Sequence, residues 1–305
     1  MTQTDTRQLV EEIDRLKREK RAVILSHNYQ IPEVQDIADY LGDSLELSRI
    51  AAGTDAEVIV FCGVHFMAET AKLLSPEKTV LLPDRDAGCP MADMVDPEAL
   101  LEFKREHPGA PVVAYVNTSA ATKAESDICC TSANAVEIVQ SLDAEEVIFI
   151  PDHHLAGWVQ EHTETRMIAW QGYCPTHIRI SPQAISQAKD KYPDAAVIVH
   201  PETPAEVRKL ADAVLSTGGM VRYARETDAK DIILGTEYGM AYRLQKENPD
   251  KTFYTIQAAV CPNMKKITLP KVAEALQKMQ YPIEIAEDIA ARARGAVEGM
   301  VHASK

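Results

Sequence analysis

The sequence predicts an α/β protein made of three similar small parallel-sheet domains in a pseudo-threefold triangular arrangement. Three observations support this fold class. Cys-Pro pairs recur at intervals of about 85 residues, apolar runs of strand length recur with the same period, and a helix candidate precedes each run. Recurrence of whole elements in one order is typical of repeat architectures. The pairs are Cys89-Pro90, Cys174-Pro175 and Cys261-Pro262.

Each repeat is expected to begin with an amphipathic helix and a buried strand. The strand candidates are continuous apolar runs that end in polar residues, as in parallel strands covered on both faces. After this strand come a Ser or Thr that opens a helix, a second apolar strand, another helix and the strand that leads to the cysteine. We expect the first helices at 7–20, 97–106 and 182–191, the first strands at 23–29, 112–117 and 196–202, and the second strands at 57–61, 146–150 and 231–234.

The repeat length divides the chain into three α/β domains and a tail. We expect the domains at 1–95, 96–180 and 181–268, each of a size that suits a small independent sheet. A fourth helix candidate at 271–279 starts a repeat that is not completed. The tail, 269–305, is therefore expected to be helical, with a last helix at 287–301 packed back on the first repeat.

Composition and charge narrow the functional classes. The 305 residues carry 32 Lys and Arg against 46 Asp and Glu, a net charge of −14. A nucleic-acid-binding surface is basic, so we expect no nucleic-acid partner. No apolar run reaches the roughly 18 residues of a membrane span, and residues 1–20 are polar, so we expect no membrane association and a cytoplasmic location. The glycine-rich motifs of nucleotide and dinucleotide sites are also absent from the sequence.

Polar residues stand at the ends of the predicted first strands. The carboxyl ends of parallel strands carry functional loops, and the helices that follow direct their N-termini to the same crevice. If the repeats pack with these ends inward, one cavity collects all of these residues, and its capped helix N-termini would bind carboxylate or phosphate groups. The strand-end residues are His27, Tyr29, Tyr115, Asn117, His200 and Glu202, and the hydroxyls expected as helix caps are Ser44, Ser132 and Thr217.

Three of the six cysteines occupy equivalent positions, which favours a shared metal site over packing or disulfides. Three thiolates without a fourth leave a coordination position open, on a zinc ion or on one iron of a cubane cluster. The candidate ligands are Cys89, Cys174 and Cys261. The cysteines without equivalents, expected in strands and core, are Cys62, Cys129 and Cys130. The Asp152-His153-His154 run is expected in a solvated loop.

These residues leave three kinds of function open: an enzyme with an iron–sulfur Lewis acid, a zinc-dependent hydrolase that uses the same thiolates, and a non-catalytic module that binds anions or senses iron. The density of acid and base groups at the strand ends favours an enzyme. A His-x-x-x-His spacing, which a zinc hydrolase could use, does not occur in the sequence.

A series of short motifs accompanies the three cysteines between residues 23 and 262. They are Ser26-His27-Asn28-Tyr29-Gln30, Gly42-Asp43-Ser44, Tyr115-Val116-Asn117-Thr118-Ser119, Thr131-Ser132-Ala133-Asn134, Gly172-Tyr173-Cys174 with His177, His200-Pro201-Glu202 and Ser216-Thr217-Gly218. In type and in order, these motifs resemble the quinolinate synthase family. No departure from the family pattern occurs at these positions.

The resemblance implies an enzyme of NAD biosynthesis that condenses iminoaspartate with dihydroxyacetone phosphate to quinolinate, with loss of phosphate and water. It implies a [4Fe–4S] cluster on the three equivalent cysteines, with one iron open as a Lewis acid. An L-aspartate oxidase or aspartate dehydrogenase would supply the imine. The implied catalytic residues are Tyr29, Glu202, His27 and His200. The implied substrate contacts are His27, Ser44, Tyr115, Asn117, Ser132, His200, Glu202 and Thr217, with His177 as a helper near the open iron.

Overall fold

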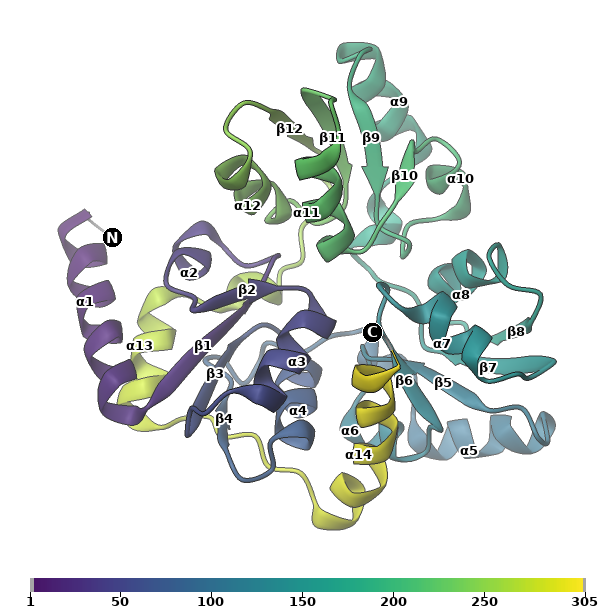
Figure 1. The fold of residues 1–305 in the computed structure, drawn as a ribbon, viewed down its shortest axis with the longest axis horizontal. Helices are drawn as coiled ribbons and strands as arrows, with labels where there is room; N and C mark the ends of the chain where they lie inside the picture. The colour runs from purple at the N-terminus through teal and green to yellow at the C-terminus, as the bar shows by residue number, and fades with distance from the viewer. Residues whose placement is uncertain (1–2, 304–305) are drawn as a thin grey trace.

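The computed structural model describes residues 3–303, which form three four-stranded parallel sheets flanked by helices in a triangular arrangement (Figure 1). The three sheets share one strand order: β2-β1-β3-β4, β6-β5-β7-β8 and β10-β9-β11-β12. In each sheet the first strand of the repeat pairs in parallel with the second and the third. The predicted fold class, three similar small parallel α/β units, is confirmed.

The strands lie close to the predicted apolar runs. The first sheet contains β1 (Ala22–His27), β2 (Tyr40–Gly42), β3 (Val58–Cys62) and β4 (Thr79–Leu81). The second contains β5 (Val112–Tyr115), β6 (Ile128–Cys130), β7 (Glu146–Ile150) and β8 (Arg166–Ala169). The third contains β9 (Ala196–Val199), β10 (Ala213–Val214), β11 (Asp231–Gly235) and β12 (Thr252–Thr255). Strands β2, β6 and β10 are not predicted from the sequence, because these edge strands are too short to form an apolar run.

The helix that precedes each first strand is found as predicted: α1 (Gln3–Lys20), α5 (Pro97–Glu106) and α9 (Pro182–Lys191). Helices α5 and α9 begin with Pro in the first turn, after the capping residues Asp96 and Ser181, which is a favoured helix start. The other helices of the repeats are α2 (Pro32–Asp36), α3 (Ser44–Gly53), α4 (His65–Leu74), α6 (Ala120–Ala124), α7 (Ala135–Ser141), α8 (His153–Gln160), α10 (Ala205–Arg208), α11 (Thr217–Glu226) and α12 (Met240–Glu247).

The C-terminal tail forms two helices, which pack on different repeats. Helix α13 (Leu269–Lys278) lies beside α1 on the first repeat. Helix α14 (Glu287–His302) lies mainly against α6 and β6 of the second repeat, and also against α4 of the first. The expected packing of the tail on the first repeat is therefore incomplete for α14, which packs on the second repeat as well. The reason is the apolar face of α14, which fills the junction of the two repeats with Ala293, Ala296, Val297 and Met300.

The apolar core is continuous across the first two repeats and reaches one face of the third sheet. Along β9, Ile198 belongs to this shared core, whereas Val197 and Val199 belong to a second, separate core. Since side chains alternate along a strand, the third sheet contributes one face to the shared core. Its other face packs on α9 and α10, through Ile185 and Val207.

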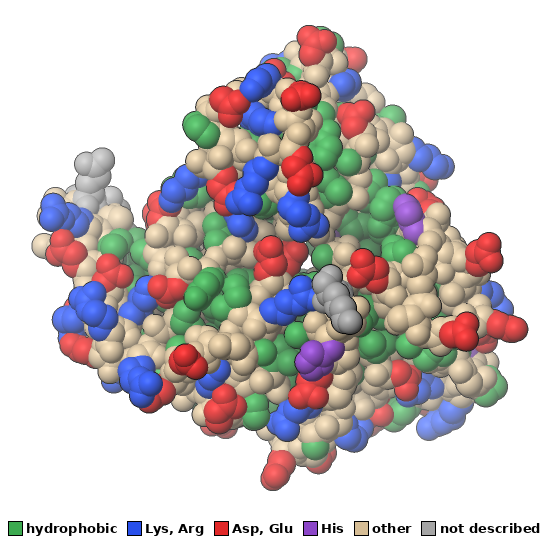
Figure 2. All heavy atoms as spheres, in the orientation of Figure 1, with side chains coloured by type: hydrophobic (Ala, Val, Ile, Leu, Met, Phe, Trp, Pro, Cys, Tyr) green, Lys and Arg blue, Asp and Glu red, His purple; other side chains and the backbone are tan. Residues whose placement is uncertain are grey.

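The surface is mixed in charge. On the face shown in Figure 2, acidic side chains are interspersed with Lys and Arg rather than gathered by sign. Among the helices of residues 3–303, none is long and apolar enough to cross a lipid bilayer.

The first and third repeats meet through polar contacts at the start of α11. The Asp43 carboxylate accepts from the N–H of Glu46 at 2.9 Å in its own repeat, and from the N–H of Gly218 across the interface. Beside it, Asn28 Nδ2 donates to Thr217 Oγ1 at 2.9 Å. A Cβ atom at Gly218 would lie 2.5 Å from Asp43 Oδ2, so a glycine is required for this approach.

The substitution Gly218→Ala should lower the free energy of unfolding by about 1–3 kcal/mol, because the methyl group displaces Asp43 from α11. Gly53→Ala is the matched control. No atom lies within 4 Å of its added Cβ, so in the last turn of α3 it should be neutral or stabilise by up to about 1 kcal/mol. Urea titrations followed by circular dichroism measure both changes, and equal losses in the two variants would contradict the assigned contact.

Candidate active site

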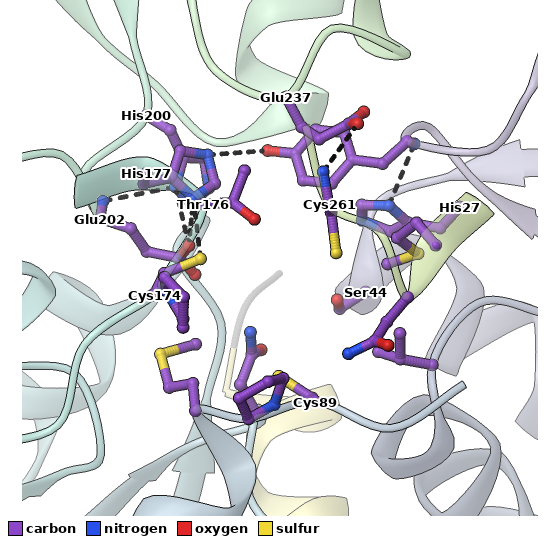
Figure 3. A pocket seen from close by; sticks show the side chains of 18 of the residues that line it. His27, Ser44, Cys89, Cys174, Thr176, His177, His200, Glu202, Glu237 and Cys261 are labelled. Carbon is purple, nitrogen blue, oxygen red and sulfur yellow. Dashed lines mark hydrogen bonds and ion pairs between the residues drawn. The ribbon is translucent and has the colours of Figure 1, made fainter. Parts of the chain in front are cut away.

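The carboxyl ends of the three sheets face one cavity of about 250 Å³ (Figure 3). Residues of all three repeats line it, and every residue that the sequence analysis assigns to the site is among them. The convergence expected from the repeat therefore occurs. These lining residues are His27, Tyr29, Ser44, Cys89, Tyr115, Asn117, Ser132, Cys174, His177, His200, Glu202, Thr217 and Cys261.

The equivalent cysteines lie in the loops that follow β4, β8 and β12, each three positions before a short 3-10 helix. These helices are η1 (Ala92–Met94), η2 (His177–Arg179) and η3 (Met264–Lys266). The thiols form no disulfide, and Figure 3 shows them around one space. Burial raises the pKa of all three thiols, to about 12 for Cys89. A bound metal would therefore have to replace the thiol protons.

The spacing of the three thiols bears on the metal group that they can hold. A tetrahedral zinc ion with Zn–S bonds of about 2.3 Å places its sulfur ligands about 3.8 Å apart. Within the described part of the chain, the residues whose ligand atoms all lie within 4.8 Å of one another are Cys174, His177 and Glu202, and the three cysteines form no such group. At least two of the three sulfur atoms therefore lie farther apart than 4.8 Å, more than one zinc ion requires, and an all-sulfur donor set suits an iron–sulfur cluster.

Two buried carboxylates hold the cysteine loops, and neither is predicted from the sequence as a site residue. Asp152 Oδ2 accepts from the N–H of Cys174 at 3.1 Å, and Glu237 Oε1 accepts from the N–H of Cys261 at 3.2 Å. Each carboxylate stands two positions after the third strand of its repeat, β7 or β11. A comparison of third-strand ends could have found the pair, although the first repeat has Val64 at this position.

The expectation of a solvated loop at 152–154 is wrong. Asp152 is fully buried and caps α8 by accepting from the N–H of Leu155 at 2.7 Å, and His153 begins the helix. The remaining cysteines are buried in strands as predicted, Cys62 in β3 and Cys129 and Cys130 in β6.

A hydrogen-bond network joins Glu202 to Tyr29 across the repeats. Glu202 Oε2 lies 2.6 Å from His177 Nδ1, and Glu202 Oε1 accepts from the Tyr115 hydroxyl at 2.6 Å. Because the carboxylate accepts from Nδ1–H, a neutral His177 ring presents Nε2 as an acceptor. This Nε2 lies 3.0 Å from Thr236 Oγ1, which lies 2.6 Å from the Tyr29 hydroxyl. Thr236, which links the two, is not predicted from the sequence as a site residue.

The surroundings of this network set the protonation states of its ends. Burial opposes ionisation of Glu202, but the close contact with His177 and the hydrogen bond from Tyr115 outweigh burial and hold the pKa of Glu202 well below its usual range. Burial raises the pKa of Tyr29 far above that of an exposed phenol, and the charge of Glu202 adds to this effect. At neutral pH the site therefore pairs a carboxylate with a protonated phenol, as acid and base catalysis require.

His27 and His200 form equivalent turns and are held as neutral rings. The N–H of Tyr29 donates to His27 Nδ1 at 3.2 Å, and the N–H of Glu202 donates to His200 Nδ1 at 3.3 Å. The proton of each neutral ring is therefore on Nε2, and for His200 this atom lies 3.2 Å from Ser132 Oγ. Burial lowers the pKa of both imidazoles to about 3. They serve as hydrogen-bond donors and not as charged groups.

The three predicted hydroxyls line the cavity, but the expectation that they cap helices is wrong. Ser44 and Thr217 are the first residues of α3 and α11, and Ser132 lies in the turn before α7. In α3 and α11 the capping side chain is that of the preceding residue, Asp43 or Ser216, which accepts from an N–H in the first turn of its own helix. The residues that occupy the cap positions are Asp43, Asn134 and Ser216.

Comparison with known proteins identifies the family of the chain. A family model described as "Quinolinate synthetase A protein" matches residues 11–302. The chain belongs to this family. Proteins named quinolinate synthase are similar over nearly the whole chain: one from Dehalococcoides mccartyi is 59% identical, covering 95% of this chain and 96% of its own length. Another, from Thermodesulfovibrio yellowstonii, is 56% identical over 96% of this chain and 97% of its own length.

An archaeal relative extends the comparison. The protein named quinolinate synthase 1 from Methanosarcina acetivorans is 53% identical, covering 96% of this chain and 97% of its own length. At such identity over such coverage, the chain is an enzyme of the quinolinate synthase type.

The neutral histidines of this quinolinate synthetase A family member should make its stability depend on pH. Since His27 and His200 have a pKa of about 3 when folded and roughly 6.5 when unfolded, the unfolded chain binds more protons below pH 6.5. The free energy of unfolding should therefore fall as the pH is lowered from 7 to 5, by up to about 1.4 kcal/mol per pH unit for each ring. Anaerobic urea titrations measure the slope.

The double variant His27→Asn and His200→Asn is the control, because the Asn side-chain oxygen can replace Nδ1 as the acceptor but does not titrate. Its stability should depend on pH less steeply. An unchanged slope would show that the two rings are not the groups responsible.

Proposed function

We propose that this chain condenses iminoaspartate with dihydroxyacetone phosphate to give quinolinate, phosphate and two waters, as a cytoplasmic step of NAD biosynthesis. The observation that carries the proposal is the gathering in one cavity of the cysteines and strand-end residues by which the sequence resembles the family. An L-aspartate oxidase or aspartate dehydrogenase reaction would supply the imine.

Cys89, Cys174 and Cys261 would hold a [4Fe–4S] cluster with one iron that lacks a cysteine ligand. When bound, the cluster supplies a Lewis acid to the cavity. The donor set fits this group, because the three thiols are free and their sulfur atoms do not all lie within the 4.8 Å that would suit a single zinc ion. Asp152 and Glu237 support the fit by fixing the backbone of two of the three loops.

Neutral donors would bind the two anionic substrates. His27 and His200 hold their Nε2 protons at the cavity, and hydroxyl groups stand at the starts of α3 and α11. Binding through neutral groups avoids burying a fixed positive charge that would persist after phosphate leaves. Asn117 adds an acceptor, since its buried Oδ1 has no hydrogen-bond partner among the described residues, and an N–H or O–H of a substrate can donate to it.

The network from Tyr29 to Glu202 would move protons during the reaction. Condensation removes a proton from carbon next to a carbonyl or imine, and dehydration gives a proton to departing hydroxide. Tyr29 can pass its phenol proton through Thr236 to Nε2 of His177, take a proton from the substrate carbon, give that proton to the departing hydroxide and then regain its own from His177. Glu202 stabilises the imidazolium that His177 forms in this exchange, as a carboxylate does for a catalytic histidine.

Apolar walls would exclude water from the imine. Phe66, Met91 and Met264 line the cavity and are at most 6% exposed. An imine is lost to hydrolysis in water, so a closed apolar boundary protects the substrate until it condenses.

Protein purified without oxygen should contain about four iron atoms per chain and absorb visible light as an iron–sulfur cluster does. Cys174→Ala should remove both the absorbance and quinolinate formation, because one cluster ligand is lost. Cys62→Ala, a buried cysteine outside the cavity, is the matched control and should keep both. A fully active preparation that contains zinc and no iron would overturn the proposed cofactor.

The substitution Thr236→Val keeps the side-chain shape but removes the hydroxyl between Tyr29 and His177. We expect it to lower kcat on the order of 10²-fold or more, the usual contribution of acid–base catalysis, with full iron content. Thr236→Ser should retain most of the activity. Equal activity of the Val and Ser variants would exclude the proton path through Thr236.

A further inference from the structure

In each repeat, the turn after the first strand carries a residue that lines the cavity. A buried hydrogen-bond donor stands six positions after that residue. The cavity residues at equivalent positions are Tyr29, Asn117 and Glu202. The donors are Gln35, Lys123 and Arg208. Each donor is at most 6% exposed, and the mechanism described above gives none of them a role.

In the first repeat, Gln35 binds both carbonyls that flank Tyr29. Its Nε2 donates to Asn28 O at 3.1 Å and to Gln30 O at 2.8 Å. The same nitrogen lies 3.0 Å from Gly239 O, which belongs to the third repeat. Gln35 therefore holds the turn of Tyr29 and joins it to a neighbouring repeat.

In the second repeat, Lys123 binds both carbonyls that flank Asn117. Its fully buried ammonium donates to Val116 O at 2.8 Å and to Thr118 O. The ammonium also lies 5.6 Å from the ring centroid of Phe66 in the first repeat, a favourable cation–π distance. The buried Nζ of Lys123 thus stabilises a turn that carries a cavity residue.

In the third repeat, Arg208 binds the carbonyls that flank Glu202. Its Nη1 donates to Thr203 O at 2.7 Å and more weakly to Pro201 O at 3.5 Å. The same nitrogen donates to His154 O of the second repeat at 3.2 Å. Different side chains therefore make the same pair of contacts in all three repeats.

The contacts between repeats form a closed ring. The first repeat reaches the third, the second reaches the first, and the third reaches the second. Each donor contacts the adjoining repeat at the start of the helix that follows the third strand of that repeat. The contacts are at Gly239 before α12, at Phe66 in α4 and at His154 in α8. The same side chain therefore fixes a cavity turn and the position of the adjoining repeat.

A physical reason connects these contacts to the site. Buried carbonyls without a donor cost free energy, so a turn with two such groups keeps them directed at their donor. The residue between the two carbonyls is then fixed, with its side chain at the cavity. Without the donor, the carbonyls must seek other partners and the turn residue moves.

We propose that Gln35, Lys123 and Arg208 are positioning residues, a ring of carbonyl-binding donors that fixes Tyr29, Asn117 and Glu202 relative to one another. Because these three cavity residues differ in chemistry, equivalent changes in the ring should have different kinetic effects. This kinetic part rests on the proposed function; the structural part does not.

The test uses anaerobically purified full-length enzyme and variants that remove the donors, Gln35→Leu, Lys123→Met and Arg208→Met. Lys123→Met should raise KM about tenfold with a smaller effect on kcat, since Asn117 is assigned to binding, whereas the other two should lower kcat about tenfold or more. Lys123→Gln, which restores the kind of donor that the first repeat uses, should recover most of the loss. Iron content should remain that of wild type.

Lys72→Met is the matched control, because Lys72 also binds two carbonyls, Pro76 O at 2.8 Å and Lys78 O at 2.7 Å, but does not line the cavity. It should leave both kinetic constants unchanged. If Lys123→Met does not fold, Gln35→Leu provides the same test in the first repeat, where the donor carries no charge.

Hydrogen–deuterium exchange separates this proposal from the proposed function. Amides 115–119 should exchange faster in Lys123→Met than in wild type or Lys72→Met, whether or not the wild type forms quinolinate. Unchanged exchange at these amides would overturn the proposal. The same conclusion would follow if the three donor variants changed kcat and KM in one common pattern.

Discussion

The structure depends on one constraint: the carboxyl ends of three parallel sheets meet in a small cavity, where each buried polar group needs a partner. No single repeat supplies these partners. Glu202 of the third repeat is paired with His177 and Tyr115 of the second, and Asn28 of the first is paired with Thr217 of the third. The site and the packing of the repeats are therefore formed by the same contacts.

Much of this arrangement could be predicted from the sequence, because a threefold repeat multiplies weak signals. One polar residue after an apolar run is ambiguous, but His27, Tyr115 and His200 at equivalent positions indicate a shared cavity. Parallel strands also present their loops at one edge, which links residues far apart in the chain. The strands with long apolar runs and the helices before them could be located for the same reason.

The remainder could not be predicted, because it does not repeat in residue type. The position two residues after the third strand holds Val64, Asp152 and Glu237. A comparison that seeks one residue type in all three repeats does not find it. Thr236 resembles any hydroxyl at the end of a strand until Tyr29 and His177 are placed beside it. The helix caps were missed by one or two positions, because sequence periodicity does not show which way a short side chain turns. The place of α14 depends on a groove that only the packed repeats create.

The division of the apolar core sets the cooperativity of the molecule. Each of the first two sheets shares its interior with a neighbouring repeat, so opening one exposes apolar surface of the other. The outer layer of the third sheet, formed by α9 and α10, belongs to the separate apolar core, and only polar contacts of Arg208 in α10 join it to α8 of the second repeat. Its loss forfeits the burial of a few side chains and leaves the common interior closed. We therefore expect the shared core to unfold as one cooperative unit and the outer layer of the third sheet to unfold more independently. The three repeats, although equal in architecture, should differ in this respect.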